Sequence, residues 1–292
     1  MPTIHLVDAS PYLFRAYFSL PDLTGPDGSP VQVVRGFASM LLRFFAEESP
    51  THVGVAFDES LNTSFRNEIY PAYKSSREEP PVELVGQLAR CQEVARALGA
   101  ATFVDSRYEA DDLIATLCAP LADAGHSVVV VTADKDLAQL VTDRVTWYDF
   151  GKGVRYGPND VVTKYGVRPE RIPDFLGLAG DSVDDIPGVK GIGKKTAALL
   201  LAEFDALEDV YADLERVGSL AIRGAKSVAR KLADGRDLAF LSRELATVAR
   251  DAPAAATLDE LAWRGADRDE VERLFAALGF VTMKERVPRW RG

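Results

Sequence analysis

The stretch VVVVTADKD, residues 128–136, joins an apolar run to a pair of acids and shows how this chain is organised. Its consecutive valines predict a buried β-strand, and Asp134 and Asp136 follow directly after it. An apolar run that ends in an acid also occurs in IHLVD at 4–8 and in HVGVAFD at 52–58. These three stretches predict that carboxylates gather at one edge of a sheet.

Strand-like and helix-like segments alternate over the first part of the chain. The expected strands are 4–8, 52–58, 102–104, 128–132 and 145–149, and the expected helices are 31–46, 82–98, 110–123 and 135–141. This alternation predicts an α/β fold with a mainly parallel central sheet flanked by helices. Ligands of such sheets bind at the carboxyl ends of the strands, which is where the acids fall.

From about residue 158 the pattern changes to helical segments and glycine-rich turns, without clear strands. The expected helices are 159–165, 170–178, 194–203, 206–215, 224–233 and 236–242, with another at 268–278. We therefore expect an α/β core at 1–166, a helical region at 167–260 and a helical tail at 261–292.

Nine acidic residues are the candidate metal ligands, because crowded carboxylates repel one another. At about 4 Å and an effective dielectric near 20, each like-charged pair costs roughly 4 kcal/mol. Divalent cations would neutralise the cluster, and ligands that are all oxygen favour Mg²⁺ or Mn²⁺. The candidates are Asp8, Asp58, Glu109, Asp111, Asp112, Asp134, Asp136, Asp181 and Asp184. The first hypothesis is metal-assisted chemistry on a phosphate.

The motif EADD at 109–112 opens an expected helix. Glu109 and Asp112 are three residues apart and share a helix face, whereas Asp111 should point elsewhere around the first turn. Plain capping of the helix N-terminus is the alternative interpretation, since acids there interact favourably with the helix dipole. Three acids in the first turn favour a function over capping alone.

The net charge of −10 would disfavour a nucleic-acid ligand, but the nine candidate acids account for most of it. Once metal ions fill the site, the rest of the chain is close to neutral. Three basic clusters then become candidate contacts to nucleic acid. They are Arg66, Lys74 and Arg77; Lys190, Lys194 and Lys195; and Arg223, Lys226, Arg230 and Lys231.

Other classes of protein are disfavoured. With 292 residues, of which 47% are hydrophobic, the chain can bury one large core or two modest ones. No apolar run reaches membrane-spanning length, and the N-terminus lacks the layout of a signal peptide. The two cysteines, Cys91 and Cys118, form no CxxC pair. We expect a reduced, cytoplasmic, monomeric protein without structural zinc and without a membrane partner.

The glycine-rich stretch GVKGIGKKT at 188–196 predicts a helix-hairpin-helix rather than an ATP-binding P-loop. The position that a P-loop gives to Ser or Thr holds Lys195, and no apolar strand precedes the stretch. Glycines and a helix N-terminus let backbone N–H groups approach a DNA phosphate, and the hairpin carbonyls could hold K⁺. The expected DNA contacts are Lys190, Gly191, Gly193, Lys194, Lys195 and Thr196.

The polar segment YKSSR at 73–77 lies between an expected strand and an expected helix. Cations beside an aromatic ring suit single-stranded DNA, whose bases stack and whose backbone is negative. Tyr73, Lys74 and Arg77 are therefore candidate substrate contacts; the alternative is a charged surface loop.

Together these motifs resemble the bacterial 5′-3′ exonuclease/flap endonuclease family, which includes the N-terminal nuclease domain of DNA polymerase I. The matching stretches cover essentially the whole chain. They include LVDASPYLFRA, VAFD, the FR at 65–66, AYKSSR, EADDLIATL, VTADKDLAQLV, KYGV, FLGLAGDSVDDIPGVKGIGKKTAALLL, RGAK and the tail LFAALGF.

The resemblance implies a PIN-like nuclease core, a helical arch at about 60–90 and a helix-3-turn-helix that grips duplex DNA. It implies catalytic roles for Tyr73, Lys74 and Arg77, DNA contact by Arg66, and hydrolysis near 5′ ends by two Mg²⁺ ions, for which Mn²⁺ can substitute. It assigns Asp8, Asp58, Glu109, Asp111, Asp112 and Asp134 to the first metal and Asp136, Asp181 and Asp184 to the second. Because the chain stops where further polymerase domains would begin, we expect a stand-alone nuclease.

Two residues depart from the family pattern, which commonly has Gly before the DKD motif and Asn after the last acid. Here these positions hold Ala133 and Asp185, and Asp185 adds a charge that is expected to alter metal occupancy at the second site. Two alternatives remain: a PIN-type ribonuclease, and a non-catalytic module that binds branched DNA.

Overall fold

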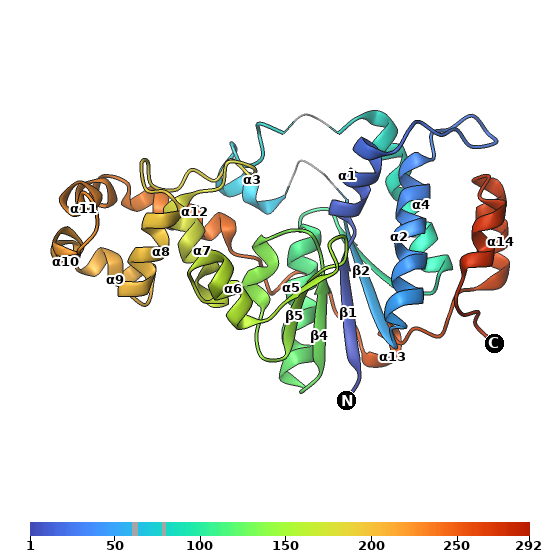
Figure 1. The fold of residues 1–292 in the computed structure, drawn as a ribbon. Helices are drawn as coiled ribbons and strands as arrows, with labels where there is room; N and C mark the ends of the chain where they lie inside the picture. The colour runs from blue at the N-terminus through green and yellow to red at the C-terminus, as the bar shows by residue number, and fades with distance from the viewer. Residues whose placement is uncertain (60–63, 78–79) are drawn as a thin grey trace.

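A six-stranded sheet forms the centre of the molecule (Figure 1). The computed structural model describes residues 1–59, 64–77 and 80–292, so parts of the expected arch at 60–63 and 78–79 lie outside the described residues. The strand order is β3-β2-β1-β4-β5-β6. The strands are β1 (Thr3–Asp8), β2 (His52–Asp58), β3 (Ala101–Asp105), β4 (Ser127–Val131), β5 (Val145–Asp149) and β6 (Val154–Tyr156).

All neighbouring strands are parallel except β5 and β6, which form an antiparallel hairpin. The central strand β1 pairs with β2 on one side and with β4 on the other, so the ends of these strands meet at one edge. Asp8 pairs with Ala56 in this register, and Asp58 pairs with Asp105. The predicted α/β fold with a mainly parallel sheet is confirmed.

Successive residues of each strand face two different helical layers, because side chains alternate across a strand. Val7 and Val55 belong to a buried cluster with α2 (Gln32–Glu48) and α4 (Val82–Ala97). Leu6 belongs to the opposite cluster, with α5 (Ala110–Asp123). One face of the sheet is covered by α1 (Ser10–Ser19), α2, α4 and α14 (Arg268–Ala277). The other face is covered by α5.

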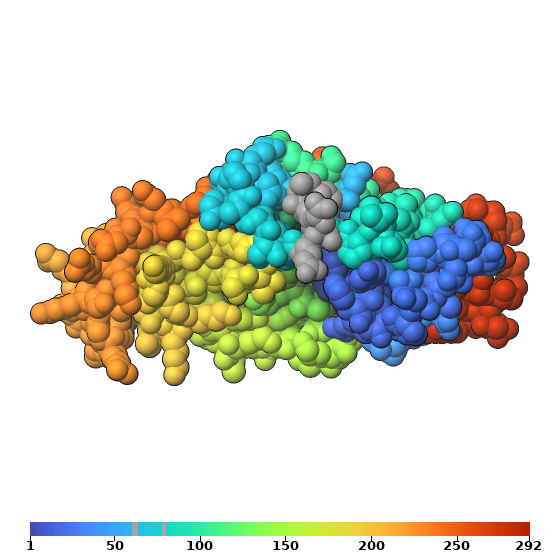
Figure 2. All heavy atoms as spheres, turned by 90° about the horizontal axis from the view of Figure 1, so that it is seen from above, coloured from blue at the N-terminus to red at the C-terminus, as the bar shows by residue number. Residues whose placement is uncertain are grey.

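A third buried cluster holds the helical region together and joins it to the sheet. It includes Phe175 and Leu200 of that region together with Trp147 of β5. The region extends from one end of the molecule, and the C-terminal tail lies at the other end (Figure 2). Its helices are α6 (Pro158–Tyr165), η2 (Pro169–Arg171), α7 (Ile172–Ala179), α8 (Lys194–Glu203), α9 (Leu207–Ala212), α10 (Leu214–Ser219), α11 (Ala225–Asp234) and α12 (Arg236–Ala246).

The C-terminal tail packs on the helical layer of the core. Its short elements are α13 (Leu258–Leu261) and η3 (Val281–Arg286), beside α14. The Trp263 ring stacks on Phe45 at 4.5 Å between centroids, and its Nε1 donates a hydrogen bond to the Leu98 carbonyl at 2.9 Å. No helix among the described residues is long and apolar enough to cross a membrane.

Several local predictions were wrong. Helix α1 and strand β6 were not predicted. A Pro in the first turn of α1 favours a helix start, but α1 has few polar residues, so its sequence shows no clear helical pattern. The helix expected at 135–141 is a short 3₁₀ helix, η1 (Asp136–Leu140). The helix expected at 206–215 is broken into α9 and α10 at Asp213, whose side chain caps α10 by accepting from the Arg216 N–H.

Candidate active site

Five of the nine predicted acids line one cavity at the carboxyl ends of the strands. Asp8 ends β1, Asp58 ends β2, Glu109 caps α5, Asp111 lies in its first turn and Asp134 follows β4. The cavity has a volume of about 240 Å³. Its other lining residues are Ser10, Pro11, Phe14, Lys74, Arg77 and Ala133.

Two hydroxyl side chains hold the central carboxylates in place. The Ser10 hydroxyl donates to Asp58 Oδ2 at 2.6 Å, and the Ser10 N–H donates to Asp8 Oδ1 at 3.0 Å. Thr132 Oγ1 donates to the other Asp8 oxygen at 2.7 Å. Neither Ser10 nor Thr132 was among the predicted site residues, although each lies within two residues of a predicted acid.

Burial and mutual repulsion oppose ionisation of these acids. Burial and the nearby charge of Asp58 raise the pKa of Asp8 to about 8. Burial also raises the pKa of Asp58, with a further contribution from Glu109, and the pKa of Asp111 lies well above its ordinary value through burial and the charge of Asp134. The cluster therefore carries fewer negative charges than its composition suggests unless cations enter it.

Two positively charged side chains of the protein, Lys74 and Arg77, pair with acids of this cluster. Lys74 Nζ donates to Glu109 Oε1 at 2.8 Å, and an Arg77 Nη donates to Asp184 Oδ1. Burial alone would raise the pKa of Glu109, but Lys74 and Arg66 lower it to about 2. Lys74 is held in the left-handed backbone region, at φ 54°, by its N–H bond to the Asp184 carbonyl.

The other four predicted acids, Asp112, Asp136, Asp181 and Asp184, lie outside this cavity. Lys135 Nζ contacts Asp181 Oδ2 at 2.5 Å and Asp136 Oδ1 at 3.2 Å. Burial and the charge of Asp134 raise the pKa of Asp136 to about 7. Burial would raise the pKa of Asp181, but its hydrogen bond from Lys135 lowers it. Asp184 is paired with Arg77, as described above.

The donor set of the cavity fits a hard divalent cation, because it consists of carboxylate oxygens whose ionisation needs a positive charge. In the described arrangement the acids lie around the cavity wall rather than at one point. No three His, Cys, Asp or Glu side chains in residues 1–59, 64–77 and 80–292 converge closely enough to share one ion. Binding an ion here therefore requires side chains to move, and an ion held by Glu109 Oε1 would have to displace Lys74 from that oxygen.

The predicted metal ligand Asp112 does not line the cavity in this structure. Its carboxylate is fully buried and forms a two-pronged ion pair with Arg66, with both nitrogen–oxygen distances at 2.8 Å. The N–H groups of Glu109 and Ala249 donate to the same two oxygens. From the helical spacing, Asp111 was expected to point away from the face of Glu109, but it lines the same cavity.

Arg66, which was predicted to contact DNA, is buried in this structure, with only 2% of its surface exposed. Besides Asp112, its guanidinium contacts Glu109 Oε2 at 3.5 Å and donates to the carbonyls of Leu245 and Thr247. Arg66, in the short helix α3 (Phe65–Ile69), thus joins α3 to α5 and to the C-terminal end of α12.

Tyr73 cannot stack on a base in this structure, because its side chain is buried in the core of the helical region. Its hydroxyl donates to Glu109 Oε2 at 3.2 Å, which makes it a positioning residue for that acid. Asp185 likewise does not line the cavity, and its Oδ2 accepts from the Ser76 N–H at 2.7 Å. Its φ of 54° is a conformation that both Asp and Asn tolerate, which explains why either residue can occupy this position.

The predicted hairpin joins α7 to α8. Gly188 adopts φ 59°, and a Cβ there would lie 2.3 Å from the Gly180 nitrogen, so the turn requires glycine. Its N–H donates to Ser242 Oγ at 2.9 Å, which ties the hairpin to α12. Lys190, Lys194 and Lys195 are exposed at its surface.

Replacing Asp112 by Asn should destabilise the fold, because the buried Arg66 charge would lose its two-pronged partner and keep only the 3.5 Å contact with Glu109. Breaking a buried pair typically costs about 3–5 kcal/mol, and urea unfolding measures this loss. Asp123→Asn, which changes an exposed acid of the same helix, should cost less than about 0.5 kcal/mol. Wild-type stability of Asp112→Asn together with weakened metal binding would contradict the assignment of Asp112 to the ion pair.

Comparisons with known proteins agree with this architecture. Residues 3–166 match the model of the 5′-3′ exonuclease, N-terminal resolvase-like domain, and residues 167–269 match that of the 5′-3′ exonuclease, C-terminal SAM fold. DNA polymerase I of Bacillus caldotenax is 41% identical over 286 residues, which are 97% of this chain and 32% of that protein. The chain thus spans about a third of the length of this curated relative.

Two solved structures share the fold. A zinc-bound T5 5′-exonuclease superposes with a TM-score of 0.69 at 21% identity, covering 97% of this chain and 98% of its own. The bacteriophage T5 D15 flap endonuclease, in a pseudo-enzyme-product complex with DNA and metal ions, superposes with a TM-score of 0.65 at 21% identity, covering 97% and 96%. From the two family models, which together span the core and the helical region, the chain belongs to the 5′-3′ exonuclease family.

Proposed function

We propose that this chain hydrolyses phosphodiester bonds at or near the 5′ ends of branched or nicked DNA, and that it depends on Mg²⁺. The observation that carries the proposal is the cavity in which five carboxylates from β1, β2, α5 and the loop after β4 face Lys74 and Arg77. Such a cavity offers negative groups for divalent cations and positive groups for a phosphate. Membership of the 5′-3′ exonuclease family supports the same reaction class.

Asp8, Asp58, Glu109, Asp111 and Asp134 would hold a divalent ion, which supplies Lewis acidity for the attack of water and neutralises phosphoryl charge. Ser10 and Thr132 keep Asp58 and Asp8 oriented toward the cavity. Lys74 and Arg77, once released from Glu109 and Asp184, would donate to the phosphoryl oxygens as negative charge develops there.

A second ion is proposed at Asp136, Asp181 and Asp184. Lys135 and Arg77 now neutralise these acids, so an ion would have to displace both side chains. Binding of the second ion would be coupled to phosphate binding by Arg77. An ion that takes Asp184 releases the Arg77 guanidinium, which then becomes available to the substrate.

The hairpin between α7 and α8 is proposed to bind the DNA backbone. Its exposed lysines would attract phosphates without reading sequence. Gly193, directly before α8, has open space where a side chain would lie, so a phosphate could approach the start of the helix. K⁺ bound to hairpin carbonyls is a further proposal, although the Gly191 carbonyl already accepts a hydrogen bond from Lys231 Nζ at 3.2 Å.

Cleavage of end-labelled DNA tests the proposed reaction. The wild-type protein should cut a 5′-flap DNA near its junction in Mg²⁺ and not in EDTA. Asp111→Asn should slow a single turnover by at least about a hundredfold, the scale of losing transition-state charge stabilisation, whereas Asp123→Asn should not. Near-normal cleavage by Asp111→Asn would contradict the assigned site.

Matched substrates in the same assay separate the alternatives. Faster cleavage of an RNA flap than of the DNA flap would favour a PIN-type ribonuclease. Tight binding of branched DNA without cleavage in Mg²⁺ or Mn²⁺ would favour a non-catalytic binding module.

The raised pKa values predict how pH affects metal binding. The pKa of Asp8 is about 8 in the folded chain, compared with about 3.9 for an unperturbed Asp, so between these values the folded state binds more protons. The metal-free protein should therefore lose stability as pH rises through this range. Because Mg²⁺ would neutralise the ionised, buried carboxylate, the increase in Tm that Mg²⁺ produces should be larger near pH 8 than near pH 5.

Thermal unfolding with and without Mg²⁺ at the two pH values measures this effect. Asp123→Asn should show the wild-type difference, and Asp8→Asn should lose most of it. Equal Mg²⁺-induced shifts at both pH values in the wild-type protein would show that protons and metal do not compete at this site.

A further inference from the structure

The end of α12 and the three residues that follow it contain no acid, but hydrogen bonds connect this segment to both groups of candidate acids. We call the segment the strap; it comprises Leu245, Ala246, Thr247, Val248 and Ala249. Each of these residues has one backbone group bonded to a side chain from elsewhere in the chain. Three buried side chains make these five bonds: Arg66 of α3, Asp112 of α5 and Gln139 of η1.

Gln139 binds the strap and the start of η1 at the same time. Its Nε2 donates to the Ala246 carbonyl at 3.0 Å and to the Asp136 carbonyl at 2.9 Å, and its Oε1 accepts from the Val248 N–H at 3.1 Å. Because two carbonyls face one end of the amide and an N–H faces the other, a glutamate of the same size would not fit this arrangement. The three bonds therefore require glutamine.

Both polar backbone groups of Asp136 are fixed by side chains. Its N–H donates to Asp134 Oδ1 at 2.8 Å, and its carbonyl accepts from Gln139. Asp134 is an acid of the cavity, so Asp136 is held between that cavity on one side and the strap on the other. The carboxylate of Asp136 extends from this backbone, and its position depends on both bonds.

Arg66 and Asp112 attach the same strap to the acids of α5. The Ala249 N–H donates to Asp112 Oδ1 at 2.7 Å. Asp112 in turn accepts from the Glu109 N–H at 3.1 Å, and Arg66 contacts Glu109 Oε2 at 3.5 Å. The strap thus holds Glu109 of the first proposed metal site and Asp136 of the second in one frame. Their spacing matters, because two-metal catalysis needs ions about 3.5–4 Å apart.

We propose that Gln139 is a positioning residue for the second metal ion. By joining Asp136 to the strap, it sets the position of that acid relative to the acids of the first site. Gln139 acts without touching the ion or the DNA, since only 6% of its surface is exposed. The inference rests on the second ion proposed above and adds to it a residue that is not itself a ligand.

Mn²⁺ binding to the full chain without DNA, followed by electron paramagnetic resonance, tests the proposal. Asp181→Asn identifies the signal of the second ion, and Asp111→Asn identifies that of the first. Gln139→Met keeps the length of the side chain but removes its three bonds. It should weaken the second ion by about tenfold or more and the first by less than about threefold, because residues that support metal ligands typically contribute about 10- to 100-fold to metal affinity.

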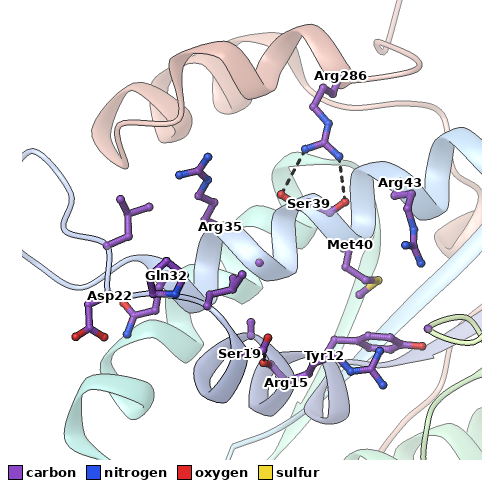
Figure 3. Close-up of a pocket in the computed structure, with 16 residues that line it drawn as sticks. Tyr12, Arg15, Ser19, Asp22, Gln32, Arg35, Ser39, Met40, Arg43 and Arg286 are labelled. Atoms are coloured by element: carbon purple, nitrogen blue, oxygen red, sulfur yellow. Dashed lines mark hydrogen bonds between the residues drawn. The ribbon is translucent and has the colours of Figure 1, made fainter.

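Two controls remove side-chain bonds made elsewhere. Thr116 Oγ1 accepts from the Ala252 N–H at 3.1 Å, three residues beyond the strap, and Thr116→Val removes this bond. Arg286 joins η3 to α2 at the cavity between α1 and α2, where it donates to the hydroxyl and the carbonyl of Ser39 at 3.4 Å each (Figure 3). Thr116→Val and Arg286→Gln should change the affinity for either ion by less than about twofold.

Amide hydrogen exchange of the metal-free protein gives a second readout. In Gln139→Met the Asp136 N–H should exchange at least about tenfold faster than the global stability of the variant accounts for, whereas in Thr116→Val it should follow the global stability. If Gln139→Met does not fold, Gln139→Asn provides the same two readouts, because its amide is shorter by one methylene and cannot bond both Asp136 and Ala246.

An unchanged affinity for the second ion in the folded Gln139 variant overturns the proposal. So does exchange of the Asp136 N–H that follows global stability, and so does a wild-type chain that binds no second Mn²⁺. Flap cleavage by the wild-type protein and by Asp111→Asn tests the proposed nuclease separately, so failure of the role of Gln139 is distinguishable from failure of the proposed reaction.

Discussion

Repulsion among buried carboxylates is the constraint on which the rest of this structure depends. The parallel sheet brings Asp8 and Asp58 to adjacent strand ends, and α5 adds Glu109 and Asp111 beside them. The chain offsets this repulsion in two ways: protonation, seen in the raised pKa of Asp8, and ion pairs to its own cations. Lys74, Arg77 and Lys135 are positioned where metal ions and substrate phosphate would compete with them.

The buried pair of Arg66 and Asp112 connects this site to the helical region. Arg66 contacts Glu109 and donates to two carbonyls at the end of α12, while Ser242 of α12 bonds the hairpin at Gly188. One continuous set of hydrogen bonds thus runs from the hairpin to a carboxylate of the cavity. If the hairpin binds DNA as proposed, that DNA contacts an element that these hydrogen bonds connect to the site.

Patterns local in sequence predicted most of the fold and part of the site. Apolar runs that end in acids correctly predicted β1, β2 and β4, because a buried strand needs a continuous apolar run. The acids meet at one edge because these strands are parallel neighbours in the sheet. The roles of Asp112 and Tyr73 could not be predicted, since they depend on contacts with Arg66 and Glu109 that lie 46 and 36 residues away along the chain. Both residues are polar and lie next to residues that line the cavity. Only their burial distinguishes a positioning role from direct contact with a ligand of the cavity.

The position of bound metal ions tests the central claim most directly. Crystals grown with Mn²⁺ would show the ions by anomalous scattering. The structure predicts an ion ligated by carboxylates from Asp8, Asp58, Glu109, Asp111 and Asp134, with Lys74 released from Glu109 and with Asp112 still paired to Arg66. An ion ligated by Asp112 would contradict this account. So would Mn²⁺ bound at full occupancy only outside this cavity, with Lys74 still bound to Glu109.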